Sequence, residues 1–475
     1  MYGTNGILWF TIVLYFITVV ITKATRGRTK FSPKCNRPSP PEVNGVSVIR
    51  VLHTLLTKGL QAMIHDQYTT LGSVFTISFF GHKVTFLIGP EVSAHFYQGL
   101  DSEISHGSGI EFTVPMIGKE VGYGVDAATR NEQNRFYYDA LKPSKLRGHV
   151  GPMLQEVEEY FAKWGQQGMV DLKQELDQLL MLISGRCLIG KEVREKMLDE
   201  FITLFNELIN NGMRLTSVLF PYAPTPANRR RDQARAKLSE MLIEIVRLRK
   251  SYNCVEDDVL QNLIDSKYRD GRSTTEAEVV GLIISLLFAG KHTSTITSTW
   301  TGAHLLANAG CLTSALEEQK QIIRKYGDNL DYNAFQEMDT LHYCIKEALR
   351  IHPPAPIFSR KVHKNFTVQT KDGNEYEIQR GHTIVSSVLF NCNLPHIYKG
   401  PDVYDPARFG PGREEDRVGG ESYAYLQIKV IWSHLLRNFE LKLESRFPET
   451  NWTKITTEPK GGVMVSYKKR HLHTT

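Results

Sequence analysis

The chain has 475 residues, of which 41% are hydrophobic and 10% aromatic, so it can bury a large core as one big domain or as two. Its formal net charge of +6 suits an anionic membrane surface or an acidic protein partner, but the charge is spread too thinly to indicate nucleic-acid binding. The six cysteines are scattered without close pairs, which argues against a zinc site and a disulfide framework. This cysteine usage fits a reducing, cytosol-facing location.

An apolar run near the N-terminus, from Ile7 to Ile21, approaches the length of a thin-bilayer span. No basic residue precedes the run, and several follow it at once: Lys23, Arg26, Arg28, Lys30 and Lys34. The positive-inside rule therefore predicts that residues 1–30 form a membrane anchor that leaves the body of the chain in the cytosol. The alternative is a cleaved signal peptide, but the run lacks a basic segment before it and a small-x-small cleavage site after it.

The rest of the chain is predicted to be a linker followed by a helix-rich body. Residues 31–46 carry several prolines and are expected to form a stiff spacer. Residues 47–475 are expected to form a single large domain. Helical patterns dominate residues 131–306, and short strand-like runs occur between residues 366 and 388. We therefore expect a mainly α fold with small β-sheets, of the α+β class.

The stretch from Thr275 to about Ala309 is predicted to be one central helix, because capping signals open it and no proline interrupts it. At about 1.5 Å per residue it would be roughly 50 Å long. Its first half is apolar on nearly every face, which indicates burial all round. The segment from Gly290 to Thr293 then places polar groups in the middle of the helix. Two interpretations stay open: a core helix that tolerates them, or a helix that opens beside a cofactor.

A second pattern combines charged residues. Glu347 and Arg350 lie at positions i and i+3 and so share one face of a predicted helix. Such a pair is usually an exposed ion pair of little energetic weight. His352 and two prolines end this helix, and Arg408 follows downstream in a Pro-Ala-Arg-Phe segment. Arg408 is therefore predicted to join the pair in a network in which both cations share one carboxylate.

Taken in order, these motifs resemble the cytochrome P-450 superfamily and, within it, the sterol 14-demethylase family of the plant obtusifoliol type. Ala289-Gly-Lys-His-Thr293 resembles the family's oxygen-activating helix, and the stretch from Phe112 to Tyr123 resembles its substrate-recognition loop. Glu347, Arg350 and Arg408 resemble its structural charged triad. The resemblance implies a haem-thiolate monooxygenase that oxidises a sterol or triterpenoid-like lipid with NADPH-derived electrons from a flavoprotein reductase. It also implies a single-pass protein of the endoplasmic reticulum membrane with a cytosolic body.

The resemblance implies roles for individual residues. Thr293 would hydrogen-bond dioxygen, His292 would take part in proton delivery, and Gly290 would let oxygen approach the helix. Tyr123 and Arg360, with Arg135 as a third, would bind the haem propionates. The residues expected to line an apolar pocket for a flat, rigid lipid are Phe112, Val114, Met116, Ile117, Phe288 and Ala289.

The substrate-recognition loop departs from the family pattern at three positions. Ile110 stands where the pattern has a tyrosine, Ile117 where it has a phenylalanine, and Gly124 where it has an acid. These changes favour a divergent sterol-like or triterpenoid substrate.

The haem-binding loop is missing from the sequence. Such enzymes need a cysteine thiolate as the proximal iron ligand, in a Phe-x-x-Gly-x-x-x-Cys-x-Gly loop ahead of the last long helix. Here Gly420 runs straight into Glu421, and no cysteine follows Cys392. We therefore predict no metal ligand, no stable thiolate-haem site, and an enzyme that is impaired or inactive as written. Two alternatives stay open: a non-catalytic lipid-binding or partner-binding membrane protein that keeps the fold, and an exon lost from the gene product.

Overall fold

The computed structural model describes residues 37–79, 82–106, 108–252, 256–412, 422–452 and 456–470. The chain divides into two compact units. The smaller comprises Met1–Ser108 and Ile357–Leu394, and the larger comprises Gly109–Pro356 and Pro395–Thr475. The predicted anchor, residues 31–36 of the predicted linker and the junction of Gly420 with Glu421 lie outside the described residues.

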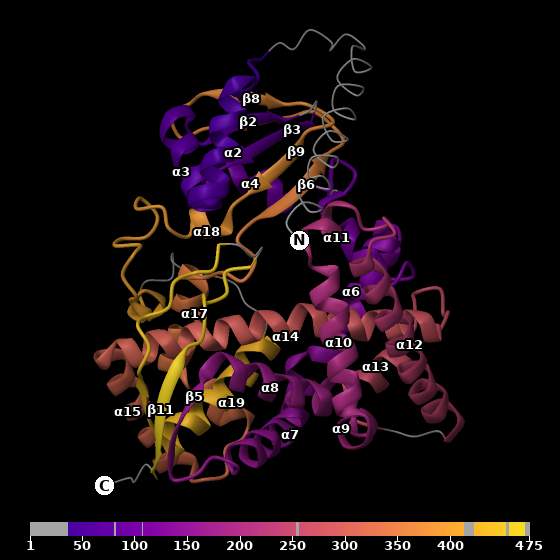
Figure 1. Cartoon of the computed structure of the whole chain (residues 1–475), viewed down its shortest axis with the longest axis vertical. Helices are drawn as coiled ribbons and strands as arrows, with labels where there is room; N and C mark the ends of the chain where they lie inside the picture. Colours follow the sequence, from indigo (N-terminus) through magenta and orange to yellow (C-terminus); the bar gives the residue numbers. More distant parts are fainter. Residues whose placement is uncertain are drawn as a thin grey trace, which may run out of the picture. The chain divides into compact units, whose positions relative to one another are not determined.

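The smaller unit is built on a six-stranded sheet with the order β1-β2-β3-β9-β6-β4 (Figure 1). The hairpin of β2 and β3 is antiparallel, and β9 joins β3 in parallel. A separate pair, β7 and β8, is antiparallel. The strands are β1 (Glu42–Val43), β2 (Val74–Phe79), β3 (His82–Leu87), β4 (Ile104–His106), β6 (Phe358–Val362), β7 (Phe366–Gln369), β8 (Glu375–Ile378) and β9 (Thr383–Ser386). The helices are α2 (Val46–Lys58), α3 (Leu60–Leu71), α4 (Pro90–Gln98) and α18 (Val388–Asn391).

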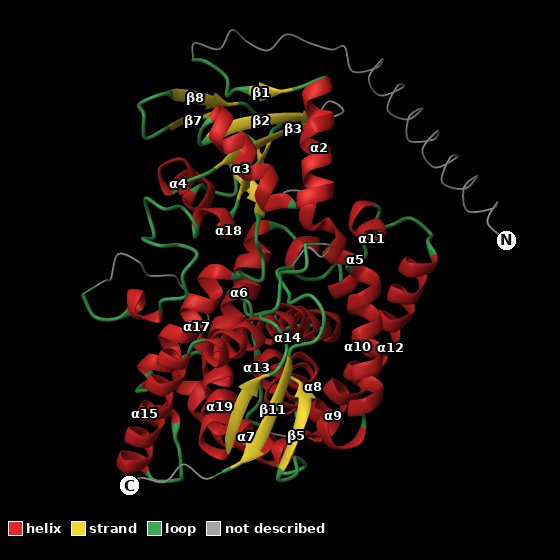
Figure 2. Cartoon of the chain, turned by 60° about the vertical axis from the view of Figure 1, so that its left-hand side comes forward, coloured by secondary structure: helices red, strands yellow, loops and turns green. Residues whose placement is uncertain are grey.

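The larger unit is mainly helical and carries a three-stranded antiparallel sheet with the order β10-β11-β5 (Figure 2). Its strands are β5 (Gln167–Asp171), β10 (Phe439–Leu443) and β11 (Met464–Lys469). Its helices up to the central one are α5 (Val114–Ile117), α6 (Ala127–Leu141), α7 (Pro143–Phe161), α8 (Leu172–Ser184), α9 (Lys191–Lys196), α10 (Leu198–Gly212), α11 (Leu215–Leu219), α12 (Pro226–Tyr252), α13 (Val259–Asp265) and α14 (Glu276–Ala307). They are followed by α15 (Ala309–Tyr326), α16 (Tyr332–Gln336), α17 (Asp339–Ile351) and α19 (Ser422–Asn438).

Short 3-10 helices occur at η1 (Ser108–Thr113), η2 (Gly122–Gly124) and η4 (Pro406–Phe409). A short π-helix occurs at η3 (Gly185–Ile189). Helices dominate the described chain, and the sheets are small. The predicted fold class, mainly α with small β-sheets, is confirmed.

The central helix of the larger unit is α14, which runs across it in Figure 1. Its N-terminus is fixed by the predicted capping box: the Thr275 hydroxyl accepts from the Glu278 amide at 3.2 Å, and the Glu278 carboxylate accepts from the Thr275 amide at 2.7 Å. The helix is long and apolar enough to cross a membrane, but most of its side chains are buried inside the unit. It is therefore the core helix of this unit.

α19 packs closely against α14 at Gly302, which has no side chain to prevent the contact. A Cβ atom at Gly302 would lie 2.1 Å from the Trp432 ring, so only glycine lets the indole pack there. The Trp432 indole nitrogen donates to the Ser298 hydroxyl at 3.0 Å. Farther along the crossing, the Gln427 amide donates to the Ser294 hydroxyl at 2.5 Å. The first turns of α19 are thereby held beside the middle of α14.

Candidate functional site

The middle of α14 has one open face, formed by Ala289, Gly290 and Thr293. Ala289 lies four and Gly290 three positions before Thr293, so each of them shares a face with Thr293. Ala289 is exposed, and a Cβ atom added at Gly290 would meet nothing within 4 Å. The Thr293 hydroxyl donates to the Ala289 carbonyl at 2.7 Å, which satisfies it within the helix. In an otherwise buried helix, this open face offers room for a bound group.

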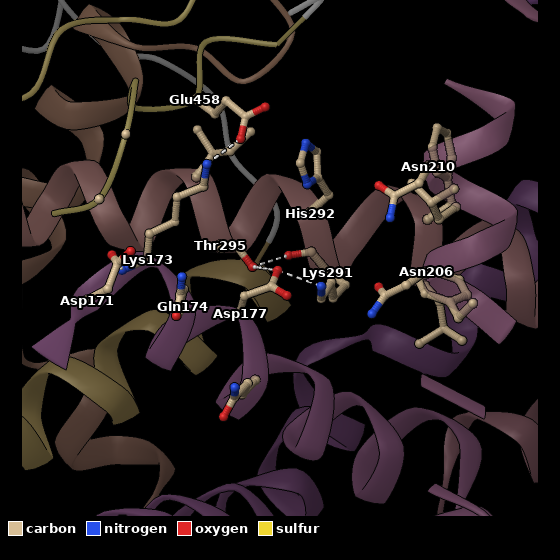
Figure 3. A pocket seen from close by; sticks show the side chains of 18 residues that line it. Asp171, Lys173, Gln174, Asp177, Asn206, Asn210, Lys291, His292, Thr295 and Glu458 are labelled. Carbon is tan, nitrogen blue, oxygen red and sulfur yellow. Dashed lines mark hydrogen bonds and ion pairs between the residues drawn. The ribbon is translucent and has the colours of Figure 1, made fainter. Parts of the chain in front are cut away.

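His292 does not belong to the open face. One residue turns a helix by about 100°, so His292 and Thr293 point in different directions. His292 lines a cavity of about 530 Å³ together with Phe288 and Lys291 of the same helix (Figure 3). We call this space the polar cavity. The proposed catalytic residues are thus divided between two faces of α14.

The polar cavity is walled by α8, α10, α14 and the segment around Glu458. α8 contributes Lys173 and Asp177, while α10 contributes Asn206 and Asn210, whose amides extend into the cavity in Figure 3. Two ion pairs cross it, because Lys291 binds Asp177 at 2.5 Å and Lys173 binds Glu458 at 2.5 Å.

His292 is the one imidazole among the residues that line the polar cavity. Burial lowers its pKa, and the nearby Glu458 carboxylate opposes this effect. Lys291 and Lys173 lower the pKa further, whereas Asp177 raises it. Among the described residues the His292 ring has no hydrogen-bond partner, so water or a ligand in the cavity can reach it.

The charged residues of α17 meet Arg408 in the core. Arg350 donates to the Glu347 carboxylate from Nε at 2.8 Å and from Nη2 at 2.9 Å, and Arg408 donates from Nε at 3.0 Å. The backbone amide of Asp405 adds a bond of 3.0 Å. All three charged side chains are at most 1% exposed, so this network ties α17 to the segment that carries η4 and leaves no room for a substrate.

The three residues predicted to bind haem propionates are divided between the two units. Tyr123 lies on η2 of the larger unit, with the Arg130 guanidinium 5.4 Å from its ring centre. Arg135, in the same unit, donates to the Lys267 carbonyl at 2.7 Å. Arg360 lies on β6 of the smaller unit and donates to the Gly99 carbonyl at 3.4 Å.

The residues predicted to line a lipid pocket fall into different environments. Met116 and Ile117 are buried in the core on α5, and the Met116 side chain packs where Gly212 leaves space. Phe112 packs against the same core and is partly buried. Phe288 faces the polar cavity, whereas Ala289 belongs to the open face. Val114, at the start of α5, is partly exposed.

The sequence interpretation missed the residues that face His292 across the cavity, namely Asp177, Asn206, Asn210 and Glu458. One signal pointed to Asp177. A partly or fully buried lysine in the middle of an apolar helix, such as Lys291, needs an acid nearby. That reasoning predicts that an acid exists, but not which helix supplies it.

Comparison with known proteins decides the family. The model of the family described as Cytochrome P450 matches residues 38–465, which span both units. The chain belongs to the cytochrome P450 family. It is 50% identical to Obtusifoliol 14-alpha demethylase of Sorghum bicolor, with 91% of each chain covered. It is 48% identical to Sterol 14-demethylase of Arabidopsis thaliana, with 96% of each covered, and 32% identical to Lanosterol 14-alpha demethylase of Bos taurus, with 91% of this chain and 88% of the relative covered.

A solved structure agrees on the fold. The retinoic acid-bound cyanobacterial CYP120A1 superposes with a TM-score of 0.78, covering 92% of this chain and 100% of that one. At 20% identity this likeness concerns the fold alone. Family and fold together imply a haem cofactor, with electrons derived from NADPH through a reductase.

Three of the described thiols do not fit the proximal ligand of such a haem. Cys187 and Cys344 are at most 1% exposed, and burial raises the pKa of each thiol to about 12, so both are neutral core side chains. Cys311 lies on α15, beyond the C-terminal end of α14. That end of α14 is roughly 25 Å from Gly290 along the helix axis. Cys392 belongs to the smaller unit. Among the described residues no group of His, Cys, Asp or Glu side chains suits a metal ion.

Two polar side chains near the start of α19 have buried atoms without a hydrogen bond in the described part of the chain. The Tyr425 hydroxyl and the Gln427 side-chain oxygen are buried and have no hydrogen-bond partner among the described residues. Buried polar atoms without partners are rare in folded proteins. Both lie in the first two turns of α19, directly after the position where the family pattern has its cysteine loop. Two buried polar atoms in the first two turns of this helix therefore have no partner among the described residues.

Proposed function

We propose that this chain carries the scaffold of a sterol 14-demethylase-type haem monooxygenase and that, as written, it does not form a thiolate-ligated haem. The 50% identity to Obtusifoliol 14-alpha demethylase over 91% of both chains carries the assignment of the class. The open face at Gly290 supports it, because open space beside an otherwise buried helix leaves room for a cofactor. The missing cysteine and the unfit thiols support the second half of the proposal.

In this proposal the open face keeps the roles that the family motif implies. Gly290 and Thr293 belong to oxygen activation, and His292 belongs to proton delivery from a different face of α14. Tyr123 and Arg360 remain candidates for the propionates. Arg135 is the weakest candidate of the three, because its guanidinium already binds the Lys267 carbonyl.

The substrate is proposed to be a sterol or a triterpenoid-like lipid. Phe112, Val114 and Ala289 are proposed to contact it, while the buried Met116 and Ile117 support that wall from behind. The proposed location is the endoplasmic reticulum membrane, with residues 1–30 as a single span and the body in the cytosol. The proposed electron donor is a flavoprotein reductase that uses NADPH.

The test compares the full chain with two insertion variants. One carries a Phe-x-x-Gly-x-x-x-Cys-x-Gly loop between Gly420 and Glu421, and the matched control carries serine in place of the cysteine. Each protein is produced with a haem precursor, reduced and treated with carbon monoxide. We expect the Soret band of thiolate-ligated haem only in the cysteine variant, because only that variant supplies the ligand.

Two results would contradict the proposal. A thiolate Soret band from the chain as written would show that another residue holds the iron. No haem uptake by the cysteine variant, judged by titration with an azole, would favour the non-catalytic lipid-binding or partner-binding alternative. Reading the transcript across the codons of Gly420 and Glu421 tests whether the loop is lost in the gene product.

A further inference from the structure

The C-terminal half of the recognition loop, residues 112–123, is packed between two helices of the larger unit. Val121 is buried beside Gly281 of α14, where an added Cβ atom would lie 2.6 Å from the valine side chain. The Ile117 carbonyl lies against the same glycine and accepts from the Arg235 guanidinium of α12 at 2.8 Å. This half of the loop is therefore held closely against both α12 and α14.

One glutamine of α6 binds the backbone of the loop at two points. The Gln133 side chain is only 1% exposed. Its amide nitrogen donates to the Glu120 carbonyl at 2.9 Å, and its amide oxygen accepts from the Gly122 backbone amide at 3.0 Å. Backbone groups that lose such partners inside a protein are costly, so Gln133 fixes this turn of the loop to α6.

The second hydrogen of the Gln133 amide nitrogen points away from the loop. It is donated to the Tyr268 hydroxyl at 3.1 Å, and that hydroxyl donates to the Glu278 carboxylate at 2.8 Å. Tyr268 is buried in the turn between α13 and α14, and Glu278 belongs to the capping box of α14. We call this series of hydrogen bonds the Gln133 relay. It connects the backbone of the loop to the first turn of α14 without a break.

The carboxylate of Glu278 sets the direction of every bond in the Gln133 relay. Burial raises the pKa of Glu278, but hydrogen bonds, first among them the one from Arg272, lower it to about 2, so the group is ionised at neutral pH. An ionised carboxylate can only accept, so the Tyr268 hydroxyl donates its one proton to Glu278 and accepts from Gln133. The amide nitrogen of Gln133 must then face Tyr268, which leaves its oxygen for the backbone of the loop.

We propose that Gln133 and Tyr268 are positioning residues for the recognition loop, and that the Gln133 relay couples the conformation of the loop to the first turn of α14. A loop that moves away leaves buried groups of the relay without partners, which weakens the first turn of α14. By the same coupling, a lipid that orders the loop stabilises this turn. Only the part that concerns the lipid rests on the proposed function, because the coupling itself needs neither lipid nor haem.

The test is hydrogen–deuterium exchange of the full chain in detergent micelles, measured by mass spectrometry on peptides that cover residues 116–124 and 276–284. The variant Tyr268→Phe removes only the hydroxyl in the middle of the relay. We expect exchange in residues 116–124 to become about two- to tenfold faster, the effect of one lost buried hydrogen bond. The variant Gln133→Met breaks the relay at the loop, and we expect faster exchange in both peptides.

The matched control is Tyr137→Phe. The Tyr137 hydroxyl also joins α6 to α14, by donating to the Leu282 carbonyl at 3.0 Å, but it is not part of the relay. This variant should leave exchange in residues 116–124 unchanged. A double variant, Gln133→Met with Tyr268→Phe, should exchange like Gln133→Met alone, because the relay is already broken, whereas independent effects would multiply.

Three results would overturn the proposal. The first is unchanged exchange of the loop in Tyr268→Phe, the second is an equal increase in Tyr137→Phe, and the third is a double variant in which the two increases multiply. A merely structural loss is recognised by faster exchange across the whole chain, and it too would count against a specific coupling.

The lipid is tested with the fluorescent sterol dehydroergosterol, whose binding is followed by energy transfer from the tryptophans. Bound sterol should slow exchange in residues 276–284 of the unmodified chain but not in Tyr268→Phe, whose affinity for the sterol should be about two- to tenfold weaker. Equal slowing in both would overturn the coupling. No sterol binding by any of the proteins would contradict the proposed substrate class, while the exchange rates measured without lipid still decide the coupling.

Discussion

Replacing Glu347 by glutamine is expected to destabilise the larger unit strongly. The Glu347 carboxylate binds the guanidinium groups of Arg350 and Arg408, and each of the three side chains is at most 1% exposed. The variant keeps the shape of the side chain but leaves two buried cations without a counter-charge. Removing one partner of a buried ion pair costs about 3–5 kcal/mol of unfolding free energy. We expect a loss in this range.

The assay is unfolding by guanidinium chloride, followed by the fluorescence of the five tryptophans. The matched control is Glu337→Gln, whose carboxylate binds Lys325 and Tyr326 at 2.6–2.7 Å but is 44% exposed. Exposed pairs contribute about 0–1 kcal/mol, so this variant should stay close to the unmodified chain. Equal losses in the two variants would refute the reasoning that burial, and not pairing alone, sets the cost.

Two further predictions use the same unfolding measurement. Burial lowers the pKa of His304 to about 3 and the pKa of its partner His352 well below the usual value. In the unfolded chain both imidazoles bind protons near pH 6.5. The unfolding free energy should therefore fall as the pH drops below about 6.5. His304→Gln should show a shallower decline, and an identical slope would contradict this. Gly302→Ala should reduce the unfolding free energy by about 1–3 kcal/mol, because its methyl group would overlap Trp432. Gly290→Ala should leave the unfolding free energy unchanged or raise it by up to about 1 kcal/mol. A larger loss in Gly290→Ala than in Gly302→Ala would contradict the packing argument.

The central helix could be predicted from the sequence because its determinants are local. The capping box at Thr275 and the absence of proline set its limits, and the structure places its ends at Glu276 and Ala307, within two residues of the prediction. The shared face of Glu347 and Arg350 is local too, since it follows from their spacing. The approach of Arg408 depends on the tertiary fold, so the order of the motifs suggested that it joins the pair but not the geometry of the contact.

The polar cavity could not be predicted, because its walls come from segments more than 250 residues apart in sequence, such as Lys173 and Glu458. The division of His292 from Thr293 was within reach, however. Neighbouring residues on a helix point in directions about 100° apart, so two adjacent polar residues rarely serve one face. Interpreting the motif as a unit concealed this separation.

The environments of the predicted lipid-pocket residues could not be predicted from the sequence either. Met116 and Ile117 were assigned to a lipid-facing wall by resemblance, and their apolar character suits a core equally well. Burial distinguishes the two environments, and it depends on what packs against α5. Met116 is buried because Gly212 of α10 leaves room for its side chain.

We infer that this cytochrome P450 chain holds the open face of an oxygen-activating site without the thiolate that such a site needs. The most direct test is the absorption spectrum of the reduced, carbon monoxide-treated full chain, recorded beside the variant with a cysteine loop between Gly420 and Glu421. We expect a thiolate Soret band from the variant and none from the chain as written. A thiolate band from the chain as written would contradict it.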